Sequence, residues 1–382
     1  MKIIGIICEY NPFHLGHEKQ LRQIRQQFGQ ESGIVCLMSG DFVQRGQPAI
    51  LGKLPRAEAA LRCGADLVLE LPVTAALSSA EGFAAGGVAI LGKFCDHLCF
   101  GAESGDSSGL LQTARVLLEE PFNIQLRQEL EAGISFPAAR QKAAEKFGLN
   151  TEFLVSPNNI LAVEYCKAML SQGCAMTPFP ILRQGSYHAE AADPENPSAT
   201  SLRRLMETGG SWLPYVPKAA ARALENAPLH TLAAGERMLL GRLRTMTDAE
   251  FEALPYGSEG LWRKLMHASR EKATLEEILQ AVKTRRYTRT RLDRMILCAC
   301  LGLTKDDLAA PAPYTRVLGF NGRGREILKI ARTTGNFPNI GEKMDHPWQA
   351  VERRCGDLYG LFALPAPERA GAEDKNRVIV LP

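Results

Sequence analysis

Residues 2–27 read KIIGIICEYNPFHLGHEKQLRQIRQQ, and the hydrophobic pattern changes once along this stretch. The apolar run at residues 3–8 is short and rich in β-branched side chains, as in a buried strand. A helical pattern follows, with apolar side chains at Leu21, Ile24 and Phe28. The stretch therefore predicts a strand that passes into a helix, with His14-Leu15-Gly16-His17 at the junction. In an open α/β sheet, ligands bind at this carboxyl end of the strands.

The junction has the chemistry of a phosphate site. A helix N-terminus has free backbone N–H groups and a partial positive charge, both of which attract phosphate. Gly16 lacks a Cβ, so a base or phosphate can approach the backbone closely. His14 and His17 are three residues apart and can face one side of the first turn. Two imidazole donors on one phosphate would stabilise the charge that develops during nucleotidyl transfer. The alternative, two unrelated loop histidines, is less favoured for this spacing between a strand and a helix.

Strands and helices continue to alternate after the junction. Strand-like runs at residues 33–38, 66–71 and 98–100 are separated by helical patterns at residues 55–63 and 78–91. This order predicts a Rossmann-like, doubly wound parallel sheet. A further strand is expected at residues 180–182, and helical patterns dominate from about residue 211. We therefore predict an α/β catalytic domain at residues 1–210 and a mainly α-helical domain at residues 211–382.

The composition is that of an ordinary globular protein, with 45% hydrophobic and 23% charged residues. The net charge is only +3, so a nucleic-acid surface would have to be local. No apolar run approaches the ~18 residues that a membrane span needs, so no membrane partner is expected. The ten cysteines include no C-x-x-C pair, which argues against a zinc site and favours reduced thiols in a cytoplasmic protein. The sequence gives no signal for an oligomeric state.

One segment is strongly basic. Residues 283–294, KTRRYTRTRLDR, hold six cationic side chains and one acid. Arginines bind phosphates and stack on bases, and tyrosine can stack on an unpaired base. Such density in a chain of low net charge favours an anionic partner larger than ATP, although a solvated start of a helix would have a similar composition. The candidate RNA-binding residues are Arg285, Arg286, Arg289 and Arg291.

Several motifs resemble known enzymes. His14-Leu15-Gly16-His17 resembles the HIGH signature of class I aminoacyl-tRNA synthetases and small nucleotidyltransferases. The longer string EYNPFHLGH at residues 9–17 is similar to the bacterial tRNA(Met) cytidine acetate ligase family. Six further strings match that family in order and spacing, namely FVQRG (42–46), DLVLELP (66–72), FGAE (100–103), PNNIL (157–161), SATSLR (198–203) and TRRYT (284–288). Two places depart from the family pattern, Asp41 and the Leu-Pro pair at residues 54–55.

The resemblance implies a reaction and a set of site residues. ATP would activate acetate as acetyl-adenylate, and the acetyl group would pass to N4 of the wobble cytidine, C34, of elongator tRNA(Met). His14 and His17 would stabilise the α-phosphate transition state, and Arg203 would neutralise phosphate charge. The ATP-binding residues it implies are Ile7, Cys8, Glu9, Tyr10, Asn11, Pro12, Phe13, His14, Leu15, Gly16, His17, Glu18, Lys19, Gln20, Gly101, Asn158 and Arg183. Mg²⁺ on the phosphates is plausible, but no protein metal site is expected.

Two other classes of function remain open. A small-molecule adenylyltransferase would share the ATP site, but such enzymes are usually one short domain. A non-catalytic tRNA-binding protein would not need the intact pair of histidines. Pyrophosphate exchange distinguishes the three, because it depends on acetate in the ligase, is independent of acetate in the adenylyltransferase and is absent in the binding protein.

Overall fold

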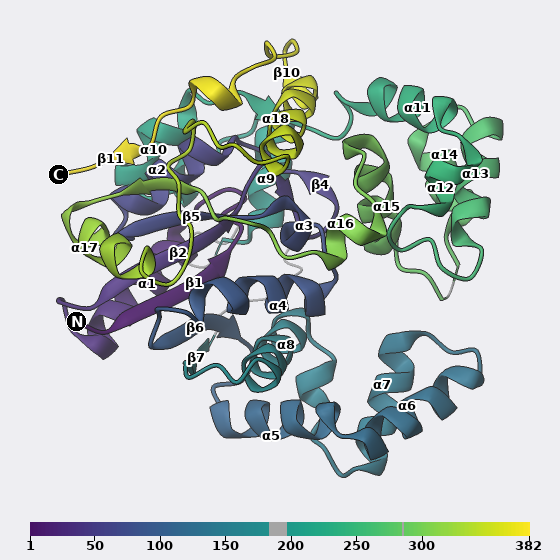
Figure 1. Cartoon of the computed structure of the whole chain (residues 1–382), viewed down its shortest axis with the longest axis horizontal. Helices are drawn as coiled ribbons and strands as arrows, with labels where there is room; N and C mark the ends of the chain where they lie inside the picture. The colour runs from purple at the N-terminus through teal and green to yellow at the C-terminus, as the bar shows by residue number, and fades with distance from the viewer. Residues whose placement is uncertain (183–196, 285) are drawn as a thin grey trace.

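The computed structural model describes residues 1–182, 197–284 and 286–382. Its centre is a seven-stranded sheet with the strand order β11-β9-β5-β2-β1-β6-β7 (Figure 1). The strands are β1 (Ile3–Cys8), β2 (Gly33–Ser39), β5 (Leu67–Leu71), β6 (His97–Ala102), β7 (Thr177–Leu182), β9 (Val317–Phe320) and β11 (Ile379–Val380). The five strands from β5 to β7 pair in parallel, and β9 pairs antiparallel to β5. The predicted Rossmann-like class is confirmed.

Helices bury both faces of the sheet, which is why β1 is apolar at nearly every position. On one face, Ile4 and Ile6 of β1 pack with α1 (Leu15–Phe28) and α2 (Lys53–Arg62). On the other face, Ile3 and Ile7 pack with α4 (Ala80–Leu91) and α8 (Pro157–Ser171). Successive strand residues thus enter two different cores, as the alternation of side chains requires.

Two groups of helices extend from the sheet (Figure 1). The first group is α5 (Ser107–Leu118), α6 (Glu120–Glu131) and α7 (Phe136–Lys146). The second, which we call the helical lobe, is α11 (Glu236–Thr245), α12 (Asp248–Glu252), α13 (Leu261–Glu271), α14 (Leu275–Val282), α15 (Arg289–Leu301) and α16 (Lys305–Ala309). The helical lobe is built around a hydrophobic cluster that includes Leu265, Ile278 and Met295 and extends to Phe42 and Tyr359 outside the lobe. The smaller elements are β3 (Phe42–Val43), β4 (Gln47–Pro48), α3 (Val73–Ala76), α9 (Ala199–Glu207), α10 (Lys218–Glu225), β8 (Leu229–His230) and β10 (Ala363–Leu364).

The last part of the chain returns to the sheet. After the helical lobe, β9 pairs with β5 and β11 pairs with β9. The helix α17 (Gly322–Ala331) packs against β5 and β9, and α18 (Trp348–Tyr359) packs against α15. The sequence interpretation of residues 211–382 as mainly helical did not foresee these strands. They are four and two residues long, too short to produce a recognisable period. The division of the chain at residue 210 stays a prediction.

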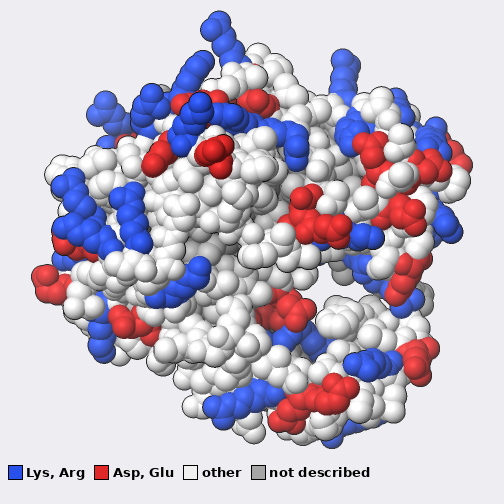
Figure 2. Space-filling model, viewed as in Figure 1, with Lys and Arg blue, Asp and Glu red and all other residues white. Residues whose placement is uncertain are grey.

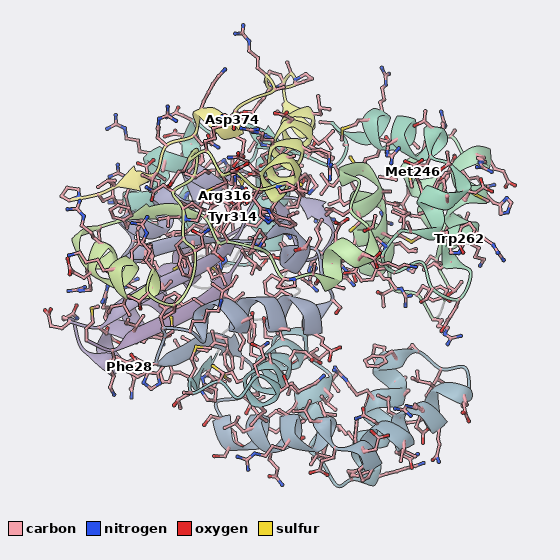
Figure 3. The ribbon with its side chains drawn as sticks, in the orientation of Figure 1. Phe28, Met246, Trp262, Tyr314, Arg316 and Asp374 are labelled. Carbon is pink, nitrogen blue, oxygen red and sulfur yellow. The ribbon has the colours of Figure 1, made fainter. Side chains whose placement is uncertain are left out.

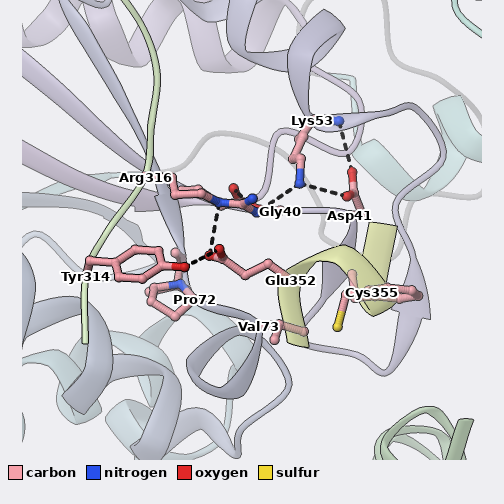
Figure 4. A pocket seen from close by; sticks show the side chains of 12 residues that line it. Gly40, Asp41, Lys53, Pro72, Val73, Tyr314, Arg316, Glu352 and Cys355 are labelled. Carbon is pink, nitrogen blue, oxygen red and sulfur yellow. Dashed lines mark hydrogen bonds and ion pairs between the residues drawn. The ribbon is translucent and has the colours of Figure 1, made fainter. Parts of the chain in front are cut away.

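A buried cluster of charges joins this C-terminal segment to the sheet (Figures 3 and 4). Lys53 Nζ lies 3.1 Å from Asp41, 3.2 Å from Glu70 and 2.9 Å from Glu373. Arg316 pairs with Glu70 at 2.8 Å, with Glu352 at 3.0 Å and with Glu373. All six side chains are at most about one-tenth exposed, and all but Glu373 line a small cavity of about 20 Å³.

The cluster has two cations and four carboxyl groups, so its ionisation is uneven. Burial and Arg316 disfavour the charge on Lys53, but the surrounding carboxylates outweigh both and raise the pKa of Lys53. Burial raises the pKa of Glu352 to about 7, against the attraction of Arg316. The Tyr314 hydroxyl donates a hydrogen bond of 2.7 Å to Glu352. The cluster therefore lowers its excess of negative charge by protonation of Glu352, which holds a proton over part of the neutral pH range.

Candidate active site

The two histidines cap the first turn of α1. His14 is the N-cap residue, and its Nδ1 accepts the Gly16 N–H at 3.1 Å. His17 Nδ1 accepts the His14 N–H at 3.2 Å, and the two rings stack with centroids 3.7 Å apart. Because each Nδ1 accepts a backbone hydrogen, the neutral ring must carry its proton on Nε2. The capping arrangement therefore sets both imidazoles as Nε2–H donors.

The residues before the histidines hold the loop between β1 and α1 in place. The rings of Tyr10 and Phe13 are buried and lie 4.8 Å and 5.5 Å from the His17 ring. Asn11 Oδ1 accepts the Ile50 N–H at 2.7 Å. Arg56 is fully buried and donates to the Glu9 carbonyl at 2.6 Å. The loop that precedes the two histidines is therefore fixed by buried side chains and hydrogen bonds.

A cavity of about 380 Å³ lies over this junction at the carboxyl ends of β1, β6 and β7. Among the predicted ATP-site residues, those that line it are Ile7, Cys8, Glu9, Tyr10, Asn11, His14, Gly16, His17, Lys19, Gln20, Gly101 and Asn158. Pro12 and Phe13 are buried beneath it, and Leu15 and Glu18 do not line it. Arg183 lies outside the described residues. Burial raises the pKa of Cys8 well above its usual value, so this thiol stays neutral and is no nucleophile.

The N-termini of α1, α8 and α9 lie at the cavity, and Ala80, the first residue of α4, lines it as well. Ser198 caps α9 by accepting the Ser201 N–H at 3.1 Å, and residues 197–200 line the wall. Arg203 also lines the cavity and donates to the Asn11 carbonyl at 2.8 Å and to Thr200 Oγ1 at 3.1 Å. The predicted catalytic residues His14, His17 and Arg203 therefore line one cavity, although Arg203 follows His14 by 189 residues in the sequence. Converging N-termini make the cavity favourable for phosphate.

Asn158 is oriented by a carboxylate that sequence reasoning did not assign. Glu103 accepts hydrogen bonds from Asn158 Nδ2 at 2.5 Å, from the Asn159 N–H at 2.9 Å and from Ser156 Oγ at 2.7 Å. Because a carboxylate accepts only from the NH₂ side of the amide, Glu103 fixes which way the Asn158 amide is turned. The FGAE string contained Glu103, but its partners follow more than 50 residues later and no local pattern connects them.

A second part of the cavity wall was also missed by the sequence reasoning. It includes Val43, Gln44, Arg45 and Gln47 of the hairpin formed by β3 and β4. Phe83, Phe100 and Tyr165 add apolar surface. The sequence analysis singled out the FVQRG string at residues 42–46, but nothing in the sequence indicated that it lies at the same cavity as the histidines.

The basic segment spans the loop before α15 and the first turns of that helix, and its described arginines have partners within the chain. Arg286 pairs with Glu259 at 2.9 Å, Arg289 with Glu276 at 2.8 Å, and Arg291 donates to the Tyr256 carbonyl at 2.8 Å. Arg285 lies outside the described residues. Positive and negative side chains are interspersed over the helical lobe on the face seen in Figure 2. The segment is therefore less strongly basic in three dimensions than in sequence, and its contact with RNA stays a prediction.

Two searches of the described residues bear on the remaining classes of site. No group of three or more His, Cys, Asp or Glu side chains within residues 1–182, 197–284 and 286–382 is placed to hold a metal ion. In the same part of the chain, no helix combines the length and apolarity that crossing a membrane requires.

Known proteins resemble the whole chain. The family model described as HIGH Nucleotidyl Transferase matches residues 1–372. The tRNA(Met) cytidine acetate ligase of Acetivibrio thermocellus is 34% identical over all of both chains. The enzyme of the same name from Clostridium tetani is 38% identical over 90% of each chain. The crystal structure of apo Thermotoga maritima TmcAL matches all of both chains with a TM-score of 0.90 and 31% identity. Its structure bound with alpha-thio ATP matches with a TM-score of 0.87 and 30% identity.

Proposed function

Because this chain belongs to the tRNA(Met) cytidine acetate ligase family, we propose that it is an ATP-dependent ligase that acetylates a cytidine of tRNA(Met). The finer proposal is that acetate is activated as acetyl-adenylate and transferred to N4 of C34 in elongator tRNA(Met). The observation that carries the ATP-dependent step is the pair of histidines at the α1 N-terminus, whose Nδ1 atoms accept backbone hydrogens and which line one cavity together with Arg203.

In the first step, an acetate oxygen attacks the α-phosphorus of ATP, and the bond to the β-phosphate oxygen breaks. Pyrophosphate leaves with the electron pair of that bond, and acetyl-adenylate remains. His14 and His17 act as hydrogen-bond donors to the α-phosphate oxygens, where negative charge increases in the transition state. Arg203 and the N-terminus of α9 oppose the charge of the leaving phosphates. No side chain needs to act as the nucleophile, because acetate itself attacks.

In the second step, the N4 amine of cytidine attacks the acetyl carbonyl. The new C–N bond forms, AMP leaves, and the amine loses one proton. The mixed anhydride is already activated, so the main task of the protein is to hold the two reactants together. We propose Arg285, Arg286, Arg289 and Arg291 as the segment that binds the tRNA, on the basis of their charge in the sequence. A Mg²⁺ ion that accompanies ATP would be held mainly by the phosphates themselves.

The decisive experiment is pyrophosphate exchange with purified protein and ATP, with and without acetate. Exchange that requires acetate supports the activation step, and exchange without acetate would instead favour a small-molecule adenylyltransferase. If no exchange occurs, elongator tRNA(Met) is added to the same reaction. Exchange that then begins would reveal an active site that requires tRNA, and continued absence would favour a non-catalytic RNA-binding protein.

A further inference from the structure

The hairpin at residues 42–48 touches both the helical lobe and the cavity. Its first residue, Phe42, is 1% exposed and belongs to the core of the helical lobe. The Phe42 ring meets the rings of Tyr359 and Phe362 edge-on, with centroids 5.7 Å and 6.1 Å away. The next residues line the cavity. One short segment is thus shared by two parts of the protein that have separate cores.

The turn of the hairpin lies directly on the backbone of α15. A Cβ atom on Gly46 would be 2.3 Å from the Arg294 nitrogen, and the φ of Gly46 is +78°. The Arg294 guanidinium, which is 8% exposed, donates to the Gln44 carbonyl at 3.2 Å. Arg294 follows Arg291 by less than one helical turn. The hairpin is therefore anchored immediately beside the residues proposed to bind RNA.

The other side of the hairpin is held by the site itself. The Gln44 N–H donates to Glu9 Oε1 at 2.8 Å, and Glu9 directly precedes Tyr10 in the loop that supports the histidines. Arg45, at the tip, is partly exposed and borders the cavity. A guanidinium in this place is suited to a phosphate group, because it offers several N–H donors in one plane.

We propose that this hairpin fixes the distance between RNA bound at α15 and the adenylate in the cavity, and that Arg45 binds a phosphodiester of the acceptor RNA. The proposal rests on the proposed function. Arg294 and Gly46 act as positioning residues, because they hold the hairpin without reaching the cavity. A reacting group displaced by about 1 Å can lose about 100-fold in rate, so loosening the hairpin should affect acetyl transfer specifically.

The test compares acetate-dependent pyrophosphate exchange with acetyl transfer at saturating tRNA(Met). Arg294→Met removes the donor to Gln44 but keeps the volume of the side chain. We expect exchange within about twofold of the unmodified protein and transfer reduced at least tenfold, with tRNA affinity unchanged. Arg294→Lys, which keeps a donor, should restore part of the transfer rate. Arg242→Met is the matched control, because Arg242 also donates to a backbone carbonyl in the helical lobe, that of Ala299 at 3.2 Å, away from the hairpin.

Arg45→Ala provides a second test that does not depend on a buried side chain. If Arg45 binds a phosphodiester of the RNA, Arg45→Ala should raise the KM for tRNA. If Arg45 instead binds the triphosphate of ATP, the variant should raise the KM for ATP in exchange, and this result would overturn the assignment of Arg45. The positioning role is wrong if Arg294→Met lowers exchange and transfer equally, lowers tRNA affinity, or changes neither rate. The unmodified protein separates this proposal from the proposed function. If it catalyses neither pyrophosphate exchange nor acetyl transfer, the proposed function is refuted and the role of the hairpin is not what failed.

Discussion

Replacing Glu352 with Gln should remove a pH dependence of stability that the buried cluster creates. Burial raises the pKa of Glu352 from an ordinary 4.5 to about 7 in the folded chain. A carboxyl group with a raised pKa contributes its full stability below the unfolded pKa, and this is lost as pH rises through the folded pKa. With these two pKa values, the free energy of unfolding should fall by about 2.5 kcal/mol between pH 5 and pH 8. Asp41, whose pKa is lowered, titrates below this window and does not mask the effect.

Thermal unfolding followed by circular dichroism at pH 5, 6, 7 and 8 measures this loss. A chain of 382 residues unfolds with an entropy of about 0.8 kcal/mol per kelvin, so the midpoint of the unmodified protein should fall by about 3 °C relative to Glu352→Gln over this range. Gln keeps a neutral acceptor for Arg316, and the Tyr314 hydroxyl can turn to accept from its NH₂ group. Glu326→Gln on α17, where the side chain is 60% exposed, is the control. A constant difference between unmodified and Glu352→Gln proteins from pH 5 to pH 8 would refute the reasoning, because Glu352 would then be ionised throughout.

Three further perturbations test other parts of the molecule. His17→Ala should slow acetate-dependent exchange, because the transition state loses about 2–4 kcal/mol of stabilisation, while ATP affinity should change less. A fully active variant would show that His17 does not stabilise the phosphate. Replacing Arg286, Arg289 and Arg291 together with Ala should weaken tRNA binding and reduce its dependence on salt while exchange survives, as measured by filter binding at several salt concentrations; an unchanged affinity would mean a solvated helix start only. Lys53→Met should lower the free energy of unfolding by about 3–5 kcal/mol at pH 7, as measured by urea titration, because Asp41, Glu70 and Glu373 lose a shared cation. A loss below about 1 kcal/mol would show that Arg316 alone neutralises these carboxylates.

The sequence predicts best where a pattern is local. The run at residues 3–8, followed by the periodic side chains Leu21 and Ile24, indicates both β1 and α1, and the capping residues between them give the site its position. The strand expected at residues 180–182 begins earlier, at Thr177. Pro178 and Pro180 obscure it, since proline cannot donate to a ladder, but β7 lies at the edge of the sheet, where proline is tolerated.

The parts that were missed depend on contacts between distant residues. Glu373 follows Lys53 by 320 residues, so no periodicity reveals that the two share a buried ion pair. Gly46 looks like an ordinary turn glycine until α15 is placed against it. The same is true of the charges in the basic segment, where Glu259 and Glu276 neutralise arginines that the sequence presents as a block.

The order of strands in the sheet has a consequence for synthesis on the ribosome. Leu71 ends β5, and its neighbour β9 begins at Val317, about 245 residues later. At about 5–20 residues per second, β5 waits roughly 10–50 s with one side of its backbone unpaired. β5 is fully buried in the finished fold, so during this time it is an exposed apolar edge, the kind that pairs with other chains. The nascent chain should therefore depend on chaperones until β9 is made, and a stop codon before residue 317 should produce aggregated protein rather than a smaller enzyme.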